Sequence, residues 1–257
     1  MRSSSEILPS SYLVFRLWGP MASWGDIAVG ERRGTWNRPS RSAILGLVAA
    51  ALGIERGNGA AHDGLENDIG FAVRVDHPGR PMRDYHTAQS PGARKGLRWS
   101  TRRDELDRSN DLNTILSERS YVTEMDAKVV LWQRNHQPSV TLAKIAAGLS
   151  EPVFAPYLGR KSCPPGLPLK PTLVDAANPL AALKAHDAAL TPDEREVLKV
   201  PRRQASLTQE FWMDEDDARD FQLDVLERTT RRDRVRDRPR WLFSGRNEVL
   251  IDTGRHP

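Results

Sequence analysis

The sequence predicts an α+β fold with a ferredoxin-like βαββαβ order of elements and a smaller β-rich region after it. Three observations support this fold class: apolar–polar alternation typical of strands, two segments with helical periodicity, and a long polar stretch between the second and third strands. A chain of 257 residues is long enough to bury a sizeable core. We expect one domain over residues 1–170 and a C-terminal region over residues 171–257.

The first strand and the first helix have the clearest signals. Residues 12–18 are apolar and partly alternating, which predicts a strand. Ser40 is a good helix N-cap, and the apolar residues that follow it, among them Ile44 and Val48, line one side of a helix. Gly53 is a natural end for this helix.

The remaining core elements follow in order. Residues 69–75 and 121–132 alternate and predict the second and third strands, a short amphipathic helix is expected over 141–149, and a last strand over 153–158. Residues 82–120 are polar with little apolar periodicity, so they form a long insertion that is functional or disordered. This order is that of the RRM-like domains that bind RNA.

The C-terminal region has weaker patterns. Residues 176–190 are alanine-rich and favour a helix, and residues 198–213 favour short strands. Residues 228–240 are a mixed-charge run rich in arginine. Residues 241–243 and 249–251 flank a polar Ser-Gly-Arg-Asn segment and predict a hairpin.

Composition bounds the class of protein. The formal net charge of +4 suits an anionic partner. The single cysteine, Cys163, excludes an internal disulfide and a cysteine-based metal cluster, and it fits the reducing cytoplasm. We expect no membrane segment, because no run approaches the roughly twenty apolar residues that a spanning helix needs. We expect no metal and no cofactor, because the histidines lack metal-ligand spacing and a glycine-rich nucleotide loop is absent.

The start of the first helix is a candidate phosphate site. Free backbone N–H groups and the positive end of the helix dipole favour an anion there. Two hydroxyls and two guanidinium groups add donors. The alternative is a capped surface helix with solvated arginines. The residues concerned are Arg38, Ser40, Arg41 and Ser42.

A second candidate is the loop that runs from Tyr157 to Ser162. Gly159 allows a turn or a close approach to a ligand, Arg160 and Lys161 supply donors for anions, and the ring of Tyr157 offers a face for a base. An ordinary basic surface loop is the alternative. Near the first strand, Met21 and Trp24 are suited to stacking on bases or to plugging the edge of the core.

The polar insertion supplies further candidates. Tyr85, His86 and Thr87 lie at its base, and adjacent Tyr and His residues invite comparison with an acid–base site. Successive strand side chains point to opposite faces, which argues against catalysis there. Cations near an aromatic residue suit a bent RNA strand, although a solvated arm is the alternative. These cations are Lys95, Arg98, Arg102 and Arg119.

Five of these segments, taken in order, resemble the CasD family, the crRNA 5′-handle-binding subunits of type I-E CRISPR Cascade. They are residues 15–25, 38–54, 83–87, 127–132 and 157–164, and the match runs from about residue 12 to about residue 169.

The resemblance implies a non-catalytic RNA-binding subunit that caps the 5′ handle of the guide RNA for antiviral defence. It implies that the insertion is a protruding thumb, that the backbone and large subunits of Cascade are partners, and that target DNA is contacted indirectly. Two other functions stay open. One is a metal-independent endoribonuclease that processes precursor crRNA, as in a related branch of the family. The other is a protein–protein adaptor that binds no RNA.

Overall fold

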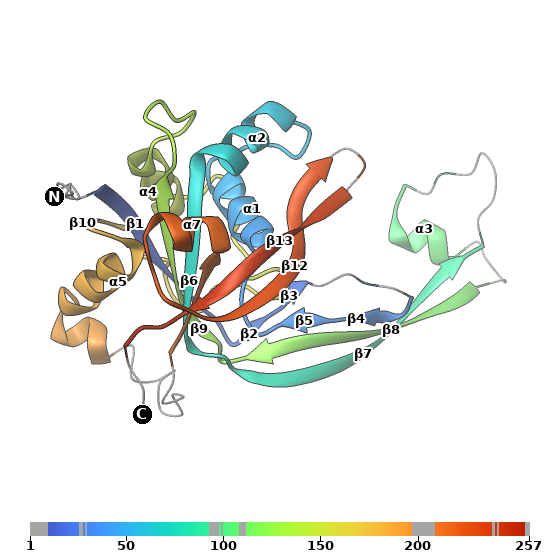
Figure 1. Ribbon diagram of the computed structural model, residues 1–257. Coiled ribbons are helices and arrows are strands. Elements are labelled where there is room, and N and C mark those ends of the chain that lie inside the picture. Colours follow the sequence, from blue (N-terminus) through green and yellow to red (C-terminus); the bar gives the residue numbers. More distant parts are fainter. Residues whose placement is uncertain are drawn as a thin grey trace, which may run out of the picture.

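The computed structural model describes residues 10–25, 28, 30–92, 98, 100–107, 112–196, 209–237, 240 and 242–254. Its centre is a seven-stranded antiparallel sheet with the strand order β10-β1-β9-β6-β11-β13-β12 (Figure 1). In that order the strands are Thr172–Ala176, Ser10–Trp18, Asp126–Gln133, Ile69–His77, Glu210–Asp214, Leu242–Ile251 and Val225–Asp237.

Helices cover both faces of this sheet. Because strand side chains alternate, Phe15 of β1 joins a core cluster with α1 and α4, whereas Val14 joins a second cluster with α5 and α7. The sheet is therefore the middle of three layers. The helices are α1 (Arg41–Ala51), α2 (Gly59–Asp68), α4 (Leu142–Ser150), α5 (Pro179–Ala188) and α7 (Glu215–Asp220).

The predictions for the first two strands and for the two core helices are confirmed at the level of single elements. Ser40 and Thr141 cap α1 and α4, since their side chains accept hydrogen bonds from the backbone N–H groups of Ala43 and Lys144. The sequence reading missed α2, in which polar residues and glycines leave little apolar periodicity.

The strand predicted over residues 153–158 is wrong. Val153 and Phe154 instead donate backbone hydrogen bonds to Ala51 O and Ala50 O, at 3.1 and 3.2 Å. They thereby satisfy carbonyl groups at the end of α1 that have no partner within the helix. The strand that pairs with β1 on the side away from β9 is β10, which begins at Thr172.

The described residues of the polar insertion form regular secondary structure. They form a long hairpin of β7 (Arg80–Pro91) and β8 (Leu112–Thr123), with α3 (Arg102–Asp107) near its far end, and the hairpin projects from the body (Figure 1). We call β7, α3 and β8 the arm. Short strands brace its base: β2 (Met21–Ala22) and β4 (Arg32–Arg33) pair with β8, and β3 (Trp24–Gly25) pairs with β5 (Thr35–Trp36).

The C-terminal region continues the same sheet. β10 extends one edge, and β11, β13 and β12 extend the other, so the domain boundary predicted at residue 170 falls within one continuous sheet. The predicted hairpin around residues 244–247 is wrong, because these residues lie inside β13, which pairs with β12. Of the short strands predicted over 198–213, the structure has β11, and residues 198–208 lie outside the described ranges.

Within these ranges, no helix has the length and apolar character needed to cross a membrane. No group of three or more His, Cys, Asp or Glu side chains in the described part of the chain could hold a metal ion.

Candidate nucleic-acid interface

The loop after α4 is fixed against the segment that follows β1. Ser23 N donates a hydrogen bond to Leu158 O at 3.0 Å, and Leu158 N donates to Cys163 O at 2.7 Å. Gly159 has a φ of +84°, and a Cβ at this position would lie 1.9 Å from Ser23 O. Only glycine fits there. Cys163 is fully buried, and burial raises the pKa of its thiol, as suits a packing residue.

Arg160 ties this loop to the base of the arm. Its Nη1 and Nη2 atoms donate to Ser120 O and Arg33 O at 3.3 and 3.1 Å. The guanidinium carbon lies 4.8 Å from the ring centre of Tyr121. The side chain predicted to grip phosphate is thus directed largely toward the protein, and it joins the loop, β8 and β4.

The neighbours of Arg160 are turned outward. Tyr157 is 40% exposed, and Lys161 and Ser162 are exposed. Their groups supply what a nucleic-acid strand needs, namely a flat face for a base, an ammonium and a hydroxyl for phosphate oxygens. The three residues and Gly159 form a surface beside the arm, which we call the loop–arm site.

The two apolar candidates after β1 differ in exposure. Met21 is half-buried and pairs with Thr123 of β8. Trp24 is only 2% exposed, and its Nε1 lies 2.8 Å from the sulfur of Met125, to which it donates. Trp24 is therefore a core residue, and the expectation that it stacks on bases is corrected.

A carboxylate of the protein itself, that of Asp233, occupies the start of α1. Arg41 N donates to Asp233 Oδ2 at 2.9 Å, and Asp233 also accepts from Nε of Arg246 at 2.7 Å. Ser40 Oγ accepts from Ala43 N at 3.1 Å. Because the Asp233 carboxylate is buried at the position expected for a phosphate, the predicted phosphate site at this helix start is wrong.

The side chains of that helix start are also engaged. Arg41 is 1% exposed and donates to the carboxylate and the carbonyl of Glu66 and to Ile69 O. Arg38 is 4% exposed, donates to Glu248 at 2.9 Å and stacks on the Trp212 ring at 3.5 Å. A phosphate could reach neither arginine unless these contacts broke. Ser42 is half-buried, with its Oγ 3.2 Å from that of Ser40.

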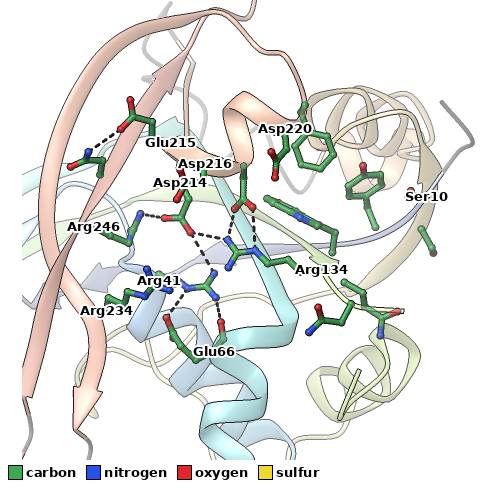
Figure 2. A pocket seen from close by; sticks show the side chains of 18 of the residues that line it. Ser10, Arg41, Glu66, Arg134, Asp214, Glu215, Asp216, Asp220, Arg234 and Arg246 are labelled. Carbon is green, nitrogen blue, oxygen red and sulfur yellow. Dashed lines mark hydrogen bonds and ion pairs between the residues drawn. The ribbon is translucent and has the colours of Figure 1, made fainter. Parts of the chain in front are cut away.

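A cavity of about 810 Å³ lies over this network (Figure 2). Arg134 donates to Asp214 at 3.0 Å and to Asp217 at 2.5 Å, and Arg246 donates to Asp214 at 2.6 Å. Burial by itself would raise the pKa of Asp214, but the guanidinium groups of Arg246, Arg41 and Arg134 hold it below its ordinary value. These compensated charges join β11 and β13 to α1, and they make the cavity floor a structural ionic network.

The candidates near the base of the arm differ in exposure: Tyr85 and Thr87 are exposed, and His86 and Arg119 are half-buried. Tyr85 is 63% exposed, and His86 Nε2 lies 2.6 Å from Asp84 Oδ2 on the same strand. Asp84 lies opposite Arg119 of β8 in the backbone register of the two strands. Tyr85 and His86 are consecutive in β7, so their side chains leave opposite faces of the arm.

The outer candidates of the arm divide into described and undescribed residues. Arg98 and Arg102 are exposed, and Arg102 donates to Glu105 at 2.5 Å, while Thr87 of β7 is exposed as well. Lys95 lies outside the described residues. Cations are thus present along the arm, where they are accessible to a partner.

Comparison with known proteins identifies the family. The family model described as "CRISPR-associated protein (Cas_Cas5)" matches residues 12–246. The "CRISPR system Cascade subunit CasD" of Escherichia coli (strain K12) is 35% identical over 181 residues, which cover 67% of this chain and 75% of that protein. The chain belongs to the CRISPR-associated Cas5 family. The resemblance to CasD seen in the sequence is confirmed.

A solved structure agrees with this membership at the level of the fold. A chain of a "CRISPR RNA-guided surveillance complex" superposes with a TM-score of 0.56 over 93% of this chain and 89% of that chain, at 24% identity. At this identity the likeness concerns the fold alone.

Sequence reasoning missed the residues that position the loop–arm site. Ser23 and Arg33 hold the loop, yet neither residue was a candidate from the sequence. Arg160 contacts Arg33 across 127 positions of the chain and Ser120 across 40, so only the tertiary structure brings them together.

Proposed function

We propose that this protein is a non-catalytic RNA-binding subunit of a type I-E CRISPR surveillance complex, Cascade. In this role it caps the 5′ handle of the crRNA in the cytoplasm and helps the complex to assemble for antiviral DNA targeting. Membership of the Cas5 family and 35% identity with the Cascade subunit CasD support the proposal. The observation that carries it is the loop–arm site, where a glycine-locked loop exposes Tyr157 and Lys161 beside the arm.

We infer further that β10, β1, β9 and β6, with α1 and α4, are an RRM-like unit and that the arm is its thumb. Side by side in the sheet stand β10, β1, β9 and β6, which are the fourth, first, third and second of these strands in chain order. The two helices pack on one face of them. RRM domains stack bases on the opposite face. Here α5 and α7 cover that face, so RNA requires another surface.

The loop–arm site suits that requirement. Gly159 and Arg160 fix the loop from within, and the exposed side chains of Tyr157, Lys161 and Ser162 stay free to contact RNA. A fixed backbone with exposed donors loses little conformational entropy when it binds. Met21 and Arg119 lie at the base of the arm, opposite Thr123 and Arg33, and we infer that they extend this surface.

The arm suits a role in assembly. It extends beyond the body of the protein and carries exposed cations such as Arg98 and Arg102 (Figure 1). In the proposed complex it lies where the handle meets the spacer, next to the backbone subunit and the large subunit. Contact with target DNA is then indirect.

The endoribonuclease alternative rests on one observation, the contact between His86 and Asp84 at 2.6 Å. A cleaving site also needs a second proton-transferring group and a stabiliser of the phosphorane charge within reach. Tyr85, the neighbouring candidate, leaves the opposite face of the strand. This arrangement favours a contact role for His86.

Binding of a labelled 5′-handle RNA to the full-length protein tests the proposal. Lys161→Ala is expected to weaken binding by about 1–3 kcal/mol and to lower the slope of log K against log salt by about 0.7, the value for one phosphate contact. Lys144→Ala, an exposed lysine on α4, is the matched control and is expected to change neither quantity.

Unchanged affinity in Lys161→Ala would contradict the loop–arm site. Incubation of precursor RNA in chelator tests the non-catalytic role separately. Cleavage that disappears in His86→Ala would favour the endoribonuclease instead.

A further inference from the structure

β12 carries arginines that the loop–arm site does not use. Along this strand Arg231 and Asp233 are buried, whereas Arg232, Arg234 and Arg236 are exposed. The mixed-charge run of the sequence therefore separates in the fold into a buried ionic half and an exposed cationic half. We call the three exposed side chains the arginine row.

The arginines of the row form no ion pair with the described residues, although Arg234 lines the cavity that also contains Asp214 and Glu66. Among the described residues, no hydrogen bond or ion pair engages Arg232, Arg234 or Arg236. Arg228, earlier in the strand, differs in that it donates to Glu215 at 2.8 Å. The carboxylate at the end of the strand, Asp237, is paired with Arg240. Three arginines outside any ion pair of the described residues thus follow one strand, and Arg234 is the one that borders the acidic cavity.

The buried half holds the row in place. Arg231 donates to Pro39 O at 3.2 Å and lies 4.6 Å from the ring centre of Trp36, and Asp233 binds α1. β12 is the outermost strand of the sheet, with β13 on one side only. Alternate residues of a regular strand are roughly 6.6 Å apart, and the register shifts of β12 between Arg231 and Arg234 and between Val235 and Asp237 make the spacing of the row uneven.

We propose that the arginine row binds the phosphate backbone of an extended nucleic-acid strand at a site separate from the 5′-handle site. Guanidinium groups match phosphate oxygens in a bidentate manner, and three of them on one strand can contact several phosphates of one nucleic-acid strand. Contacts between guanidinium groups and phosphates do not depend on the bases, so the proposed contact is independent of sequence. The ligand is therefore a single strand of any sequence, either RNA or DNA.

The test uses the full-length protein with labelled oligo(dT) and oligo(U), neither related to a repeat. The triple variant Arg232→Gln, Arg234→Gln, Arg236→Gln is expected to bind more weakly. The slope of log K against log salt is expected to fall by about 2, because each lost phosphate contact lowers it by about 0.7. The control is Lys144→Gln, Lys184→Gln, Arg219→Gln, which removes the same charge from exposed residues of other elements.

An equal loss of slope in both triple variants would overturn the proposal, because net charge alone would then explain the result. An unchanged slope in the arginine-row variant would also overturn it, because the row would then make no contact with the oligonucleotide. An effect on one oligonucleotide only would support the row and identify its strand as DNA or RNA. If thermal unfolding shows that the triple variant does not fold, Arg232→Gln and Arg236→Gln are measured singly, each with an expected slope loss of about 0.7.

The proposal for the arginine row and the proposal for the handle site are tested by different results. The preference for the 5′-handle RNA over a scrambled RNA is expected to be unchanged in the arginine-row variant. Lys161→Ala is instead expected to weaken binding of the 5′-handle RNA and to lower its salt slope by about 0.7, whether or not the arginine row is intact.

Discussion

Gly159→Ala probes the feature on which the loop–arm site depends. The added methyl would lie 1.9 Å from Ser23 O and 2.7 Å from Ser23 C, both backbone atoms that no side-chain rotation can move away. The loop would have to retreat, and the hydrogen bond between Ser23 N and Leu158 O would be lost. A φ of +84° is also unfavourable for alanine.

The expected cost follows from these two effects. The left-handed backbone costs about 1–2 kcal/mol for a residue with a Cβ, and a lost backbone hydrogen bond costs about 0.5–1.5 kcal/mol. Gly159→Ala should therefore lower the free energy of unfolding by about 1.5–3.5 kcal/mol, which lowers Tm by roughly 3–14 °C for a chain of this size.

Urea and thermal unfolding measure this cost, and Gly30→Ala is the matched control. Gly30 has a φ of +65° but no atom within 4 Å of its Cβ position, so its substitution carries the backbone cost alone, about 1–2 kcal/mol at most. If Gly159→Ala is no more destabilising than Gly30→Ala, the close approach to Ser23 does not hold the loop and the reasoning is refuted.

Three further predictions follow from other contacts. Asp233→Ala removes the carboxylate that accepts hydrogen bonds from Arg246 and from Arg41 N, while Asp214 and Glu248 still pair with Arg246, so urea unfolding should show a loss of about 1–3 kcal/mol; no measurable loss would mean that this carboxylate is dispensable. Arg160→Ala should weaken handle binding by about 1–2 kcal/mol without changing the salt slope, and Arg160→Lys should not restore it, because the two carbonyl bonds are missing; a reduced slope would show direct phosphate contact. Hydrogen bonds from Ser139 hold the pKa of Asp68 below its ordinary value, so this carboxylate stabilises the fold above about pH 4 and the contribution is lost as the pH falls through the lower folded-state pKa. Asp68→Asn should therefore flatten the fall in stability below about pH 4, and an unchanged profile would contradict this.

Local sequence was sufficient for elements whose signals are local. The apolar alternation of β1 and β6 and the caps Ser40 and Thr141 depend on neighbouring residues, and the structure has these elements where the sequence predicts them. Residues 153–158 also look like a strand, but their backbone groups bind the end of α1 instead. No local pattern distinguishes the two outcomes.

The candidate site shows the same division. The start of α1 has every local property of a phosphate site, yet Asp233, which lies 192 positions from Arg41, occupies it. The loop at Gly159 was recognised from its glycine and cations. Its attachment to Ser23 and Tyr121 depends on contacts between segments far apart in the chain, which a single sequence does not reveal.

The central claim is that the 5′ handle binds at the loop–arm site and not on the face of the sheet. Photo-crosslinking of a 4-thiouridine-substituted handle RNA to the full-length protein, with the crosslinked peptides identified by mass spectrometry, tests it most directly. The account predicts crosslinks to peptides that contain Tyr157, Lys161 and Met21. Crosslinks confined to α5 and α7, with none at the loop–arm site, would contradict it.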